Sequence, residues 1–453
     1  MKKKYLSLLI ILPIIIGIFY LYKNNYKESN NLSTPKEEVK TSNSRYAIYI
    51  ENNSGDYELS RSNAFPGSEY ILNREESYCE NGTTLEWDEI NNTLLLNTST
   101  QDKCFIYFDI TFAGAIIELS KTRNHIIHHN GTITPAVAGI DENDTTTILD
   151  AEDDSYRYAG SNEIVNDNWV CFGYARENES VCSAANFATS EYAYRIIGVF
   201  KDVDGNSNDA YYVKLIKATS YKSTTNNVTT WNRTGSGATI QNNTYANSTL
   251  LNGTSSVLNG TSARTTIVPY TKPGGSYGDN ETDKEEYEVD TYLYQIIDNG
   301  WNNYIAQPVW NVGGCSPANC KNGTAKTAYI AEMTGQGATA TNNTNKIGLM
   351  YVNDYAYAEA SNYWTTVLGI YDSEAAAQDW LISDTEWTIS CSGITSAAFG
   401  VYSYGRVFTD HAYDYSYVVR PVLYLSSNIK IDTNNMSDSN MGTISNPYRL
   451  SMN

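Results

Sequence analysis

The segment YRIIGVF (194–200), KDVDGNSNDA (201–210) and YYVKLIK (211–217) places two apolar runs on either side of a polar stretch that contains Gly and Asp. Both runs are rich in β-branched and aromatic residues, so the pattern predicts two antiparallel strands joined by a long hairpin loop. Two more apolar runs, KIGLMYV (346–352) and YVVRPVLYL (417–425), have the composition of strands buried inside a sheet. The chain is therefore expected to be built mainly from β-strands.

Strand patterns continue on the N-terminal side of this hairpin. Between residues 45 and 110, short apolar runs such as YAIYI (46–50) and CFIYFDI (104–110) are separated by clusters of Asn, Gly and Asp. They predict a small β domain over 45–110. We expect a short helix and a linker over 111–154, and a larger domain with long loops over 155–453.

The N-terminus has the features of a membrane anchor. Residues 5–22, YLSLLIILPIIIGIFYLY, carry no charge, and three lysines precede them. A helix of this length spans roughly 27 Å, close to the hydrocarbon core of a bilayer. The lysines favour a cytoplasmic N-terminus. These features predict a single-pass cell-membrane protein with a transmembrane anchor over 1–23, so the membrane is an expected partner. A disordered stalk over 24–44 and an extracellular remainder should follow the anchor.

The charge of the chain limits its possible partners. Acidic residues outnumber basic residues, 51 to 31, which gives a formal net charge of −20. Such a surplus of negative charge repels phosphate backbones, so nucleic acid is not expected as a partner.

Seven cysteines lie in the part expected outside the cytosol, where disulfides persist. The pairs that would each close a local loop are Cys79 with Cys104, Cys171 with Cys182, and Cys315 with Cys320. This pairing leaves Cys391 over, and sequence alone does not fix the connectivity. No C-x-x-C motif occurs, so the sequence does not support a zinc site or thiol redox chemistry.

Two clusters contain residue types that bind metals. They are His125, His128 and His129, and Asp202, Asp204 and Asp209. A helix would place two of the imidazoles on one face, but no acidic or Cys partner follows at ligand spacing, so surface histidines are favoured. The aspartate spacing does not fit an EF-hand loop, so a plain turn is favoured there. We expect no metal and no cofactor.

Catalytic motifs are absent from the sequence. It contains no nucleophile elbow, zinc-protease helix, P-loop or dinucleotide fingerprint. Asp384 and Glu386 could form the carboxylate pair of a glycosidase, but the tryptophans that flank them are typical of a buried strand. We therefore expect no catalytic residues and a protein that is not an enzyme.

Nine blocks of sequence between about 156 and 450 carry a family resemblance. They are YRYAG (156–160), NWVCFG (168–173), YRIIGVF (194–200), VKLIK (213–217), VWNVGG (309–314), KIGLMYVNDYAYA (346–358), WLISDTEWTIS (380–390), YVVRPVLYL (417–425) and GTISNPYRL (442–450). In this order they resemble a family of uncharacterised bacterial surface proteins with a C-terminal C-type-lectin-like domain of the formylglycine-generating-enzyme type. The resemblance implies an α+β, mostly β fold, with an N-terminal transmembrane helix, a small β domain and a C-type-lectin-like domain with long loops. The calcium-binding motifs of lectins are absent, so calcium-dependent sugar binding is not implied.

A tyrosine-rich segment, FGVYSYGRVFTDHAYDYSY (399–417), precedes the last apolar run. Related folds in retroelement-diversified receptors display variable residues just before a similar V-R-P-V strand. Tyrosine offers a large rigid contact face and a hydroxyl group at low entropic cost. The candidate ligand-binding residues are Tyr402, Tyr404, Arg406, His411, Tyr413, Asp414, Tyr415 and Tyr417. Ordinary strand tyrosines are the alternative, because the chain contains 38 tyrosines.

These features together predict a membrane-anchored, extracytoplasmic binding or adhesion protein that recognises a glycan or protein ligand. The alternatives are a structural cell-surface component without a specific ligand and a cell-surface enzyme that acts on glycans. Arg420, in the last strand, is expected to pair with a carboxylate or with carbonyl groups and so fix that strand.

Overall fold

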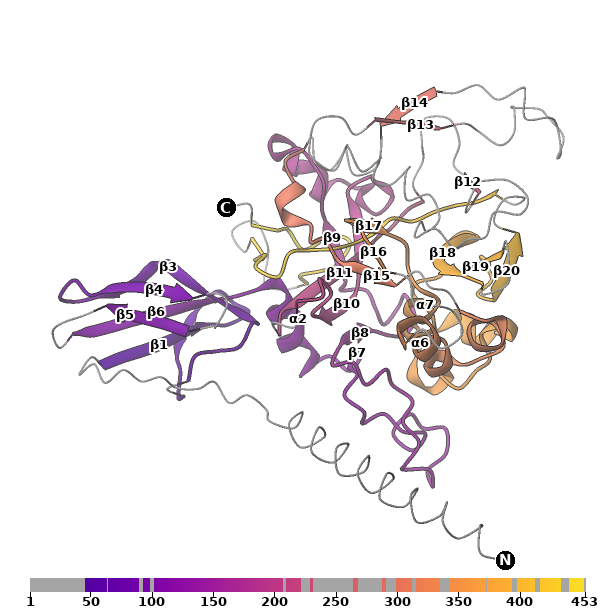
Figure 1. Cartoon of the computed structure of the whole chain (residues 1–453), viewed down its shortest axis with the longest axis horizontal. Coiled ribbons are helices and arrows are strands. Elements are labelled where there is room, and N and C mark those ends of the chain that lie inside the picture. The colour runs from indigo at the N-terminus through magenta and orange to yellow at the C-terminus, as the bar shows by residue number, and fades with distance from the viewer. Residues whose placement is uncertain are drawn as a thin grey trace, which may run out of the picture.

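The computed structural model describes residues 45–451 apart from 63, 89–92, 98–101, 207–208, 221–228, 231–263, 268–286, 291–298, 312–314, 335–341, 372, 393–396, 412–415 and 433–439. This part of the chain forms a small β domain and a larger domain, and the small domain projects from one side of the larger one (Figure 1). It is mainly β, with few and short helices.

Six strands form the small β domain. They are β1 (Arg45–Glu51), β2 (Tyr57–Leu59), β3 (Tyr70–Cys79), β4 (Thr84–Asp88), β5 (Thr93–Asn97) and β6 (Lys103–Ile110). Four of them make a sheet in the order β2-β1-β6-β3, in which β1 and β6 run parallel, and β4 and β5 form a separate hairpin. One face of the sheet buries Ile48, Cys104, Ile106 and Phe108.

Helix α2 (Phe112–Ser120) connects the two domains. The side chain of Thr111 caps it by accepting a hydrogen bond from the backbone N–H of Gly114 (2.9 Å). Most of the helix is buried, and it contacts the sheet of the larger domain. After it, β7 (Ile126–His128) is an edge strand of that sheet. The segment expected to be a helix and a linker thus supplies a helix and a strand to the large core, and residues 112–451 are called the large domain below.

The predicted hairpin lies at the centre of the large domain. β10 (Ala193–Lys201) pairs antiparallel with β11 (Tyr211–Lys217), as the sequence predicts. Their sheet has the order β17-β22-β11-β10-β8-β7, with β9 also paired to β10. The further strands of this sheet are β8 (Tyr156–Tyr158), β9 (Trp169–Cys171), β17 (Ile347–Gly348) and β22 (Val422–Tyr424). Both predicted apolar runs therefore contribute strands to one buried sheet.

Short elements surround the large sheet. The helical ones are η1 (Arg176–Ser183), η2 (Phe187–Thr189), η4 (Asn302–Tyr304), α5 (Pro317–Cys320), α6 (Ala325–Thr334), α7 (Val352–Ala358), η5 (Ser361–Tyr363), η6 (Leu368–Ile370) and α8 (Ser373–Ala377). The strands are β12 (Thr229–Thr230), β13 (Arg264–Ile267), β14 (Tyr287–Asp290), β15 (Val309–Asn311), β16 (Asn342–Thr344), β18 (Glu386–Cys391), β19 (Ala397–Val401), β20 (Val407–His411) and β21 (Ser416–Tyr417). β18, β19 and β20 make a three-stranded sheet.

The predicted fold class was wrong in including a transmembrane helix. Among residues 45–451, where described, no helix is long and apolar enough to cross a membrane. The physical reason is length, because α6 has 10 residues and α2 has 9, whereas a membrane span needs about 20. The predicted anchor over 1–23 and the stalk over 24–44 lie outside the described residues.

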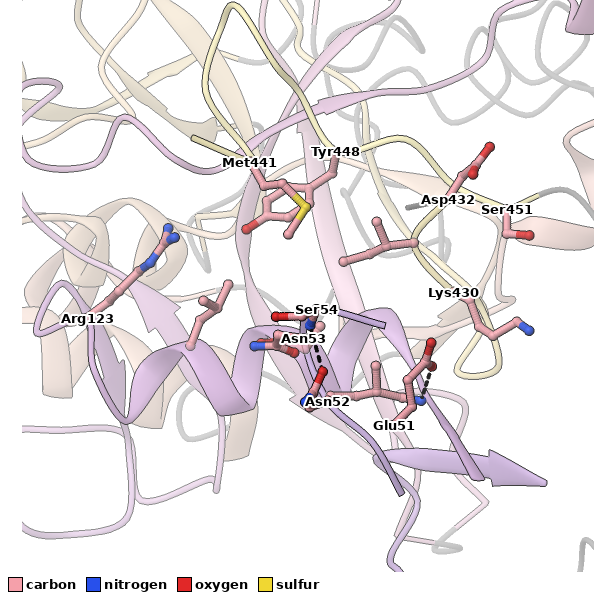
Figure 2. A pocket seen from close by; sticks show the side chains of 14 residues that line it. Glu51, Asn52, Asn53, Ser54, Arg123, Lys430, Asp432, Met441, Tyr448 and Ser451 are labelled. Carbon is pink, nitrogen blue, oxygen red and sulfur yellow. Dashed lines mark hydrogen bonds between the residues drawn. The ribbon is translucent and has the colours of Figure 1, made fainter. Parts of the chain in front are cut away.

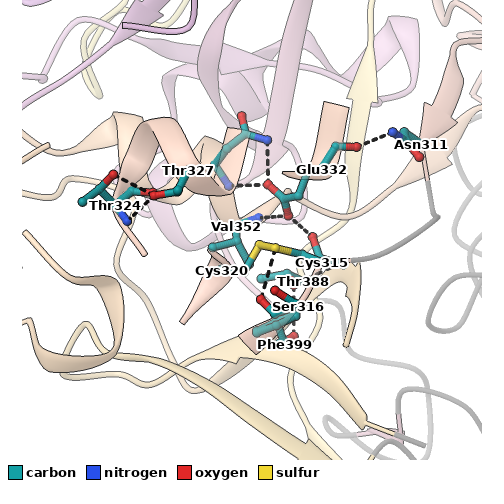
Figure 3. Close-up of a disulfide and its surroundings, with 12 residues drawn as sticks. Asn311, Cys315, Ser316, Cys320, Thr324, Thr327, Glu332, Val352, Thr388 and Phe399 are labelled. Atoms are coloured by element: carbon teal, nitrogen blue, oxygen red, sulfur yellow. Dashed lines mark hydrogen bonds between the residues drawn. A yellow bond between two sulfur atoms is a disulfide. The ribbon is translucent and has the colours of Figure 1, made fainter. Parts of the chain in front are cut away.

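Three disulfides confirm the predicted pairs. They are Cys79–Cys104, Cys171–Cys182 and Cys315–Cys320. The last of them ties α5 to the residues before it and lies near the buried carboxylate of Glu332 (Figure 3). That carboxylate accepts hydrogen bonds from the backbone N–H groups of Val352 and Asn353 at the start of α7. The disulfide therefore lies beside the buried hydrogen bonds at the start of α7.

Candidate binding surfaces

Five aromatic side chains form a row on the face of the small sheet opposite its core. We call this row the aromatic ladder, and its members are Tyr78, Phe105, Tyr49, Tyr107 and Tyr57. The alternation of side chains along a strand explains the arrangement. In β6, Cys104 and Ile106 point into the core, so Phe105 and Tyr107 point to the other face. The strand register places Tyr78 opposite Phe105 and Tyr49 opposite Tyr107.

The rings of the ladder contact one another in sequence. The distance between ring centroids is 5.1 Å for Tyr78 and Phe105, and 6.5 Å for Phe105 and Tyr49. Tyr49 and Tyr107 stack at 4.8 Å, and Tyr107 and Tyr57 make a T-shaped contact at 5.0 Å. The row therefore runs across the sheet from β3 to β2.

The ladder is accessible, and the hydroxyls of Tyr57 and Tyr107 are held in the neutral form. Tyr78 is 52% exposed, and the other four side chains are half-buried. Burial raises the pKa of Tyr107. The pKa of Tyr57 is also raised, first by burial and then by its hydrogen bond to Asp109. The surface thus combines aromatic rings with uncharged hydroxyl groups, a combination suited to an uncharged ligand that has apolar and hydroxylated faces.

The ladder was not predicted from the sequence. Its signal is present in CFIYFDI, where Phe105 and Tyr107 alternate with Cys104, Ile106 and Phe108. Residues 104–108 are apolar or aromatic at every position, so alternation alone does not identify the buried face. The rings become a continuous row only through the registers of β1, β3 and β6.

Part of the predicted tyrosine-rich site does come together. Tyr402, Tyr404, Arg406 and Tyr417 lie around the hairpin formed by β19 and β20, and we call them the hairpin cluster. Tyr402 stacks between Tyr404 (4.9 Å) and the buried Phe408 (4.1 Å). Tyr404 is 55% exposed, and the guanidinium of Arg406 lies 5.9 Å from its ring. The hydroxyl of Tyr417 donates to Asp410 (2.8 Å). The cluster therefore exposes one ring and one cation.

The rest of the predicted site is not placed. The backbone of His411 ends β20, but its side chain is outside the described part. Tyr413, Asp414 and Tyr415 also lie outside the described residues. A ligand-binding role for the segment 399–417 stays a prediction.

Arg420 forms the contact expected of it. Its guanidinium donates two hydrogen bonds to Glu386 (2.8 and 2.7 Å) and one to the carbonyl oxygen of Leu381 (2.6 Å). Both side chains are buried. A carboxylate held in this way is not accessible to a substrate, so Glu386 does not fit the glycosidase pair considered with Asp384.

The histidine and aspartate clusters have structural partners. His125 pairs with Asp167 (2.8 Å) and His128 with Asp154 (2.7 Å). The prediction of surface histidines was wrong for His129, which is fully buried against the ring of Trp364. Among the described residues, no group of three or more His, Cys, Asp or Glu side chains could hold a metal ion.

The aspartates of the predicted hairpin loop stabilise the turn. Asp202 accepts from the backbone N–H of Ala210 (3.1 Å), and Asp204 accepts from that of Asn206 (3.1 Å). Asp209 forms an ion pair with Lys201 (2.8 Å). These contacts agree with a plain turn.

A cavity of about 310 Å³ lies where the two domains meet (Figure 2). Residues 51–54 of the small domain line it, together with Arg123 and Lys430 of the large domain. Both cations are paired, Arg123 with Asp167 and Lys430 with Asp109 of the small domain (2.7 Å). The pair of Lys430 and Asp109 therefore joins the two domains beside the cavity, whereas the pair of Arg123 and Asp167 lies within the large domain.

Comparison of the chain with protein-family models, with curated proteins and with solved structures gave no match. The resemblance to lectin-like surface proteins thus stays a prediction from the sequence.

Proposed function

We propose that the protein is an extracytoplasmic binding module that recognises a glycan through the aromatic ladder. The observation that supports this function is the row of five contacting rings on the sheet face opposite the core. Small-molecule sites are usually concave, whereas a row of rings on a sheet matches an extended ligand.

The physical basis is stacking. The C–H faces of a pyranose ring are apolar and pack on aromatic faces, while its hydroxyl groups reach the rims of the rings. Tyr49 and Tyr107 stack at the middle of the row, so they would contact the centre of a bound chain. Because these rings are held by strand pairing, little entropy is lost when a ligand binds.

The disulfides support the proposed extracytoplasmic location. Three disulfides within the described residues are typical of proteins that fold in an oxidising compartment, outside the cytosol. One of them, Cys79–Cys104, joins the residues next to Tyr78 and Phe105 and so fixes one end of the ladder.

The test is a glycan and cell-surface-protein array probed with the full-length protein, with and without a chelator. The ladder variant carries Tyr49→Ala and Tyr107→Ala, and the matched control carries Tyr402→Ala and Tyr404→Ala. We expect the ladder variant to bind glycan at least about tenfold more weakly, because two ring contacts are lost. We expect the control to bind like the wild type.

The other outcomes separate the alternatives. Loss of binding only in the control would move the site to the hairpin cluster. Binding only to proteins would contradict the ligand class. A blank array with folded protein, verified by intact disulfides and circular dichroism, would favour a structural surface component.

A further inference from the structure

Lys214 and Asp354 form a contact in the buried core of the large domain. Lys214 lies in β11, at the centre of the sheet, and Asp354 lies in α7. Lys214 Nζ is 2.6 Å from Asp354 Oδ2, and both side chains are 1% exposed. The two residues are 140 positions apart in the sequence. The contact thus joins two distant elements of the core.

Aromatic rings surround the Lys214 amine. Its Nζ lies 4.8 Å from the ring centroid of Tyr351, 5.1 Å from Phe200, 5.2 Å from Tyr424 and 5.7 Å from Trp310. All four side chains belong to the buried core. In such surroundings the free energy that two charges lose with their hydration exceeds the free energy that they gain from attracting each other.

The surroundings favour an uncharged, nucleophilic amine. Burial lowers the pKa of Lys214, against the attraction of Asp354, and the positive charge of Arg157 acts in the same direction as burial. A neutral lysine amine is a nucleophile, and buried lysines in proteins use this property in covalent chemistry.

The carboxyl group of Asp354 is fixed in position. Its Oδ2 accepts a hydrogen bond from the backbone N–H of Tyr351 (2.8 Å), which caps α7. The guanidinium of Arg157 lies close by and donates to Asn353 Oδ1 (2.9 Å). A fixed carboxyl group next to a fixed amine has a high effective concentration, and a nearby cation stabilises negative charge that develops on the carboxyl oxygen.

We propose that Lys214 and Asp354 condense to an intramolecular amide bond that cross-links β11 to α7. A proton first passes from Nζ to the carboxylate along the existing hydrogen bond. Nζ then attacks Cγ of Asp354, the Nζ–Cγ bond forms, one Cγ–O bond breaks, and a second Nζ proton leaves with that oxygen as water. The reaction needs no oxidant or co-reactant. The oxygen that leaves is Oδ2, which receives the proton, and Oδ1 remains as the amide carbonyl oxygen. This proposal is independent of the proposed glycan binding.

A second pair in the same chain provides an internal control. Lys430 Nζ and Asp109 Oδ2 lie 2.7 Å apart, almost the same distance. However, the Lys430 side chain is 25% exposed and borders the junction cavity. Water stabilises its ammonium form, so this pair should remain ionic.

Peptide mapping by mass spectrometry tests the proposal on the full-length, reduced and alkylated protein. Trypsin does not cut after an acylated lysine. We therefore expect peptide 202–217 joined to peptide 347–406, with the mass of both minus one water, and no cleavage at Lys214. Peptide 407–430 should appear free, because Lys430 is not cross-linked.

The proposal is overturned if peptides 202–214 and 347–406 are recovered separately as the main products. Lys214→Arg should abolish the joined peptide and restore cleavage at position 214, because a guanidinium is too weak a nucleophile. Lys430→Arg is the matched control and should leave the joined peptide unchanged. If Lys214→Arg prevents folding, the digest of the wild-type protein still decides between an amide bond and an ion pair.

Discussion

The small β domain displays its aromatic side chains, whereas the large domain buries them. In the small domain Tyr49, Phe105 and Tyr107 lie on the sheet face opposite the core. In the large domain the fully buried tryptophans are Trp301, Trp310, Trp364, Trp380 and Trp387. Four of them donate their indole N–H to a backbone carbonyl oxygen, namely Trp301, Trp310, Trp364 and Trp380, the last to Tyr158 (2.9 Å).

The comparison shows that aromatic content alone does not indicate recognition. Many of the 38 tyrosines are core residues, and Tyr158, Tyr355 and Tyr357 are completely buried. The rings of the large domain also surround buried cations, as Trp380 does at 4.4 Å from the guanidinium of Arg195. Whether an aromatic ring can take part in recognition or packs in the core depends on the face of the sheet on which it lies.

The largest expected effect on stability comes from removing one partner of a buried ion pair in the large domain. Arg420→Ala leaves the Glu386 carboxylate buried without its cation, so we expect the large domain to lose about 3–5 kcal/mol of stability. Chemical denaturation measures this loss. The matched control is Arg406→Ala, an exposed arginine, for which we expect less than about 1 kcal/mol. Equal losses would contradict the picture of a dry core held by buried ion pairs.

The sequence predicted those parts of the fold that depend on local patterns. The hairpin of β10 and β11 was predicted because two apolar runs flank one polar turn. The role of residues 126–128 was missed, since three residues of an edge strand carry no periodicity of their own. That strand is fixed by pairing with β8 and by the packing of α2 on the sheet, both of which are long-range contacts.

The next largest effect concerns the disulfide of the small domain. Cys79→Ala with Cys104→Ala opens a loop of 25 residues in a domain whose core cluster has four buried residues in its described part. We expect a loss of about 2–4 kcal/mol, with faster hydrogen exchange in β6. Cys315→Ala with Cys320→Ala opens a loop of 5 residues, so its loss should be about 1 kcal/mol smaller. A larger loss of stability in the variant without Cys315 and Cys320 would show that disruption of the core outweighs the effect of loop entropy.

The candidate site was less predictable than the fold. The sequence favoured the segment 399–417 because tyrosines are dense there. In the structure, three of them lie around one hairpin, namely Tyr402, Tyr404 and Tyr417. It missed the aromatic ladder, whose members come from β1, β2, β3 and β6. A row built across strands depends on register, and register is set by the turns and by the buried face.

A smaller effect is the pH dependence of stability, which should differ between the two domains. Burial holds the pKa of His129 well below 6.5, so the unfolded chain gains a proton that the folded large domain does not. We expect this domain to lose stability as the pH falls below about 6.5, with His125, whose pKa burial also lowers, acting in the same direction. His129→Gln should reduce this loss in denaturation curves recorded from neutral pH to about pH 5.

The small domain should respond at lower pH. Burial opposes ionisation of Asp102, but hydrogen bonds from Thr83, Asn81 and Lys103 outweigh it and lower its pKa to about 2 from 3.8. Its contribution is therefore present above pH 3.8 and is lost as the pH falls towards 2. Hydrogen exchange in β6 and β11 would follow the two domains separately. Loss of protection in β6 near pH 6 would contradict the assignment.

The smallest expected effect on stability provides the sharpest test of the two surfaces. Tyr78 at the end of the ladder and Tyr404 in the hairpin cluster are 52% and 55% exposed. Each stacks on one neighbouring ring, so Tyr78→Ala and Tyr404→Ala should each change stability by less than about 0.5 kcal/mol. Their effects on glycan binding should differ, since only Tyr78→Ala shortens the row that the ligand would cover. Because exposure and stability are matched, a weaker affinity for Tyr78→Ala alone would assign the site to the ladder, and the reverse result would assign it to the hairpin.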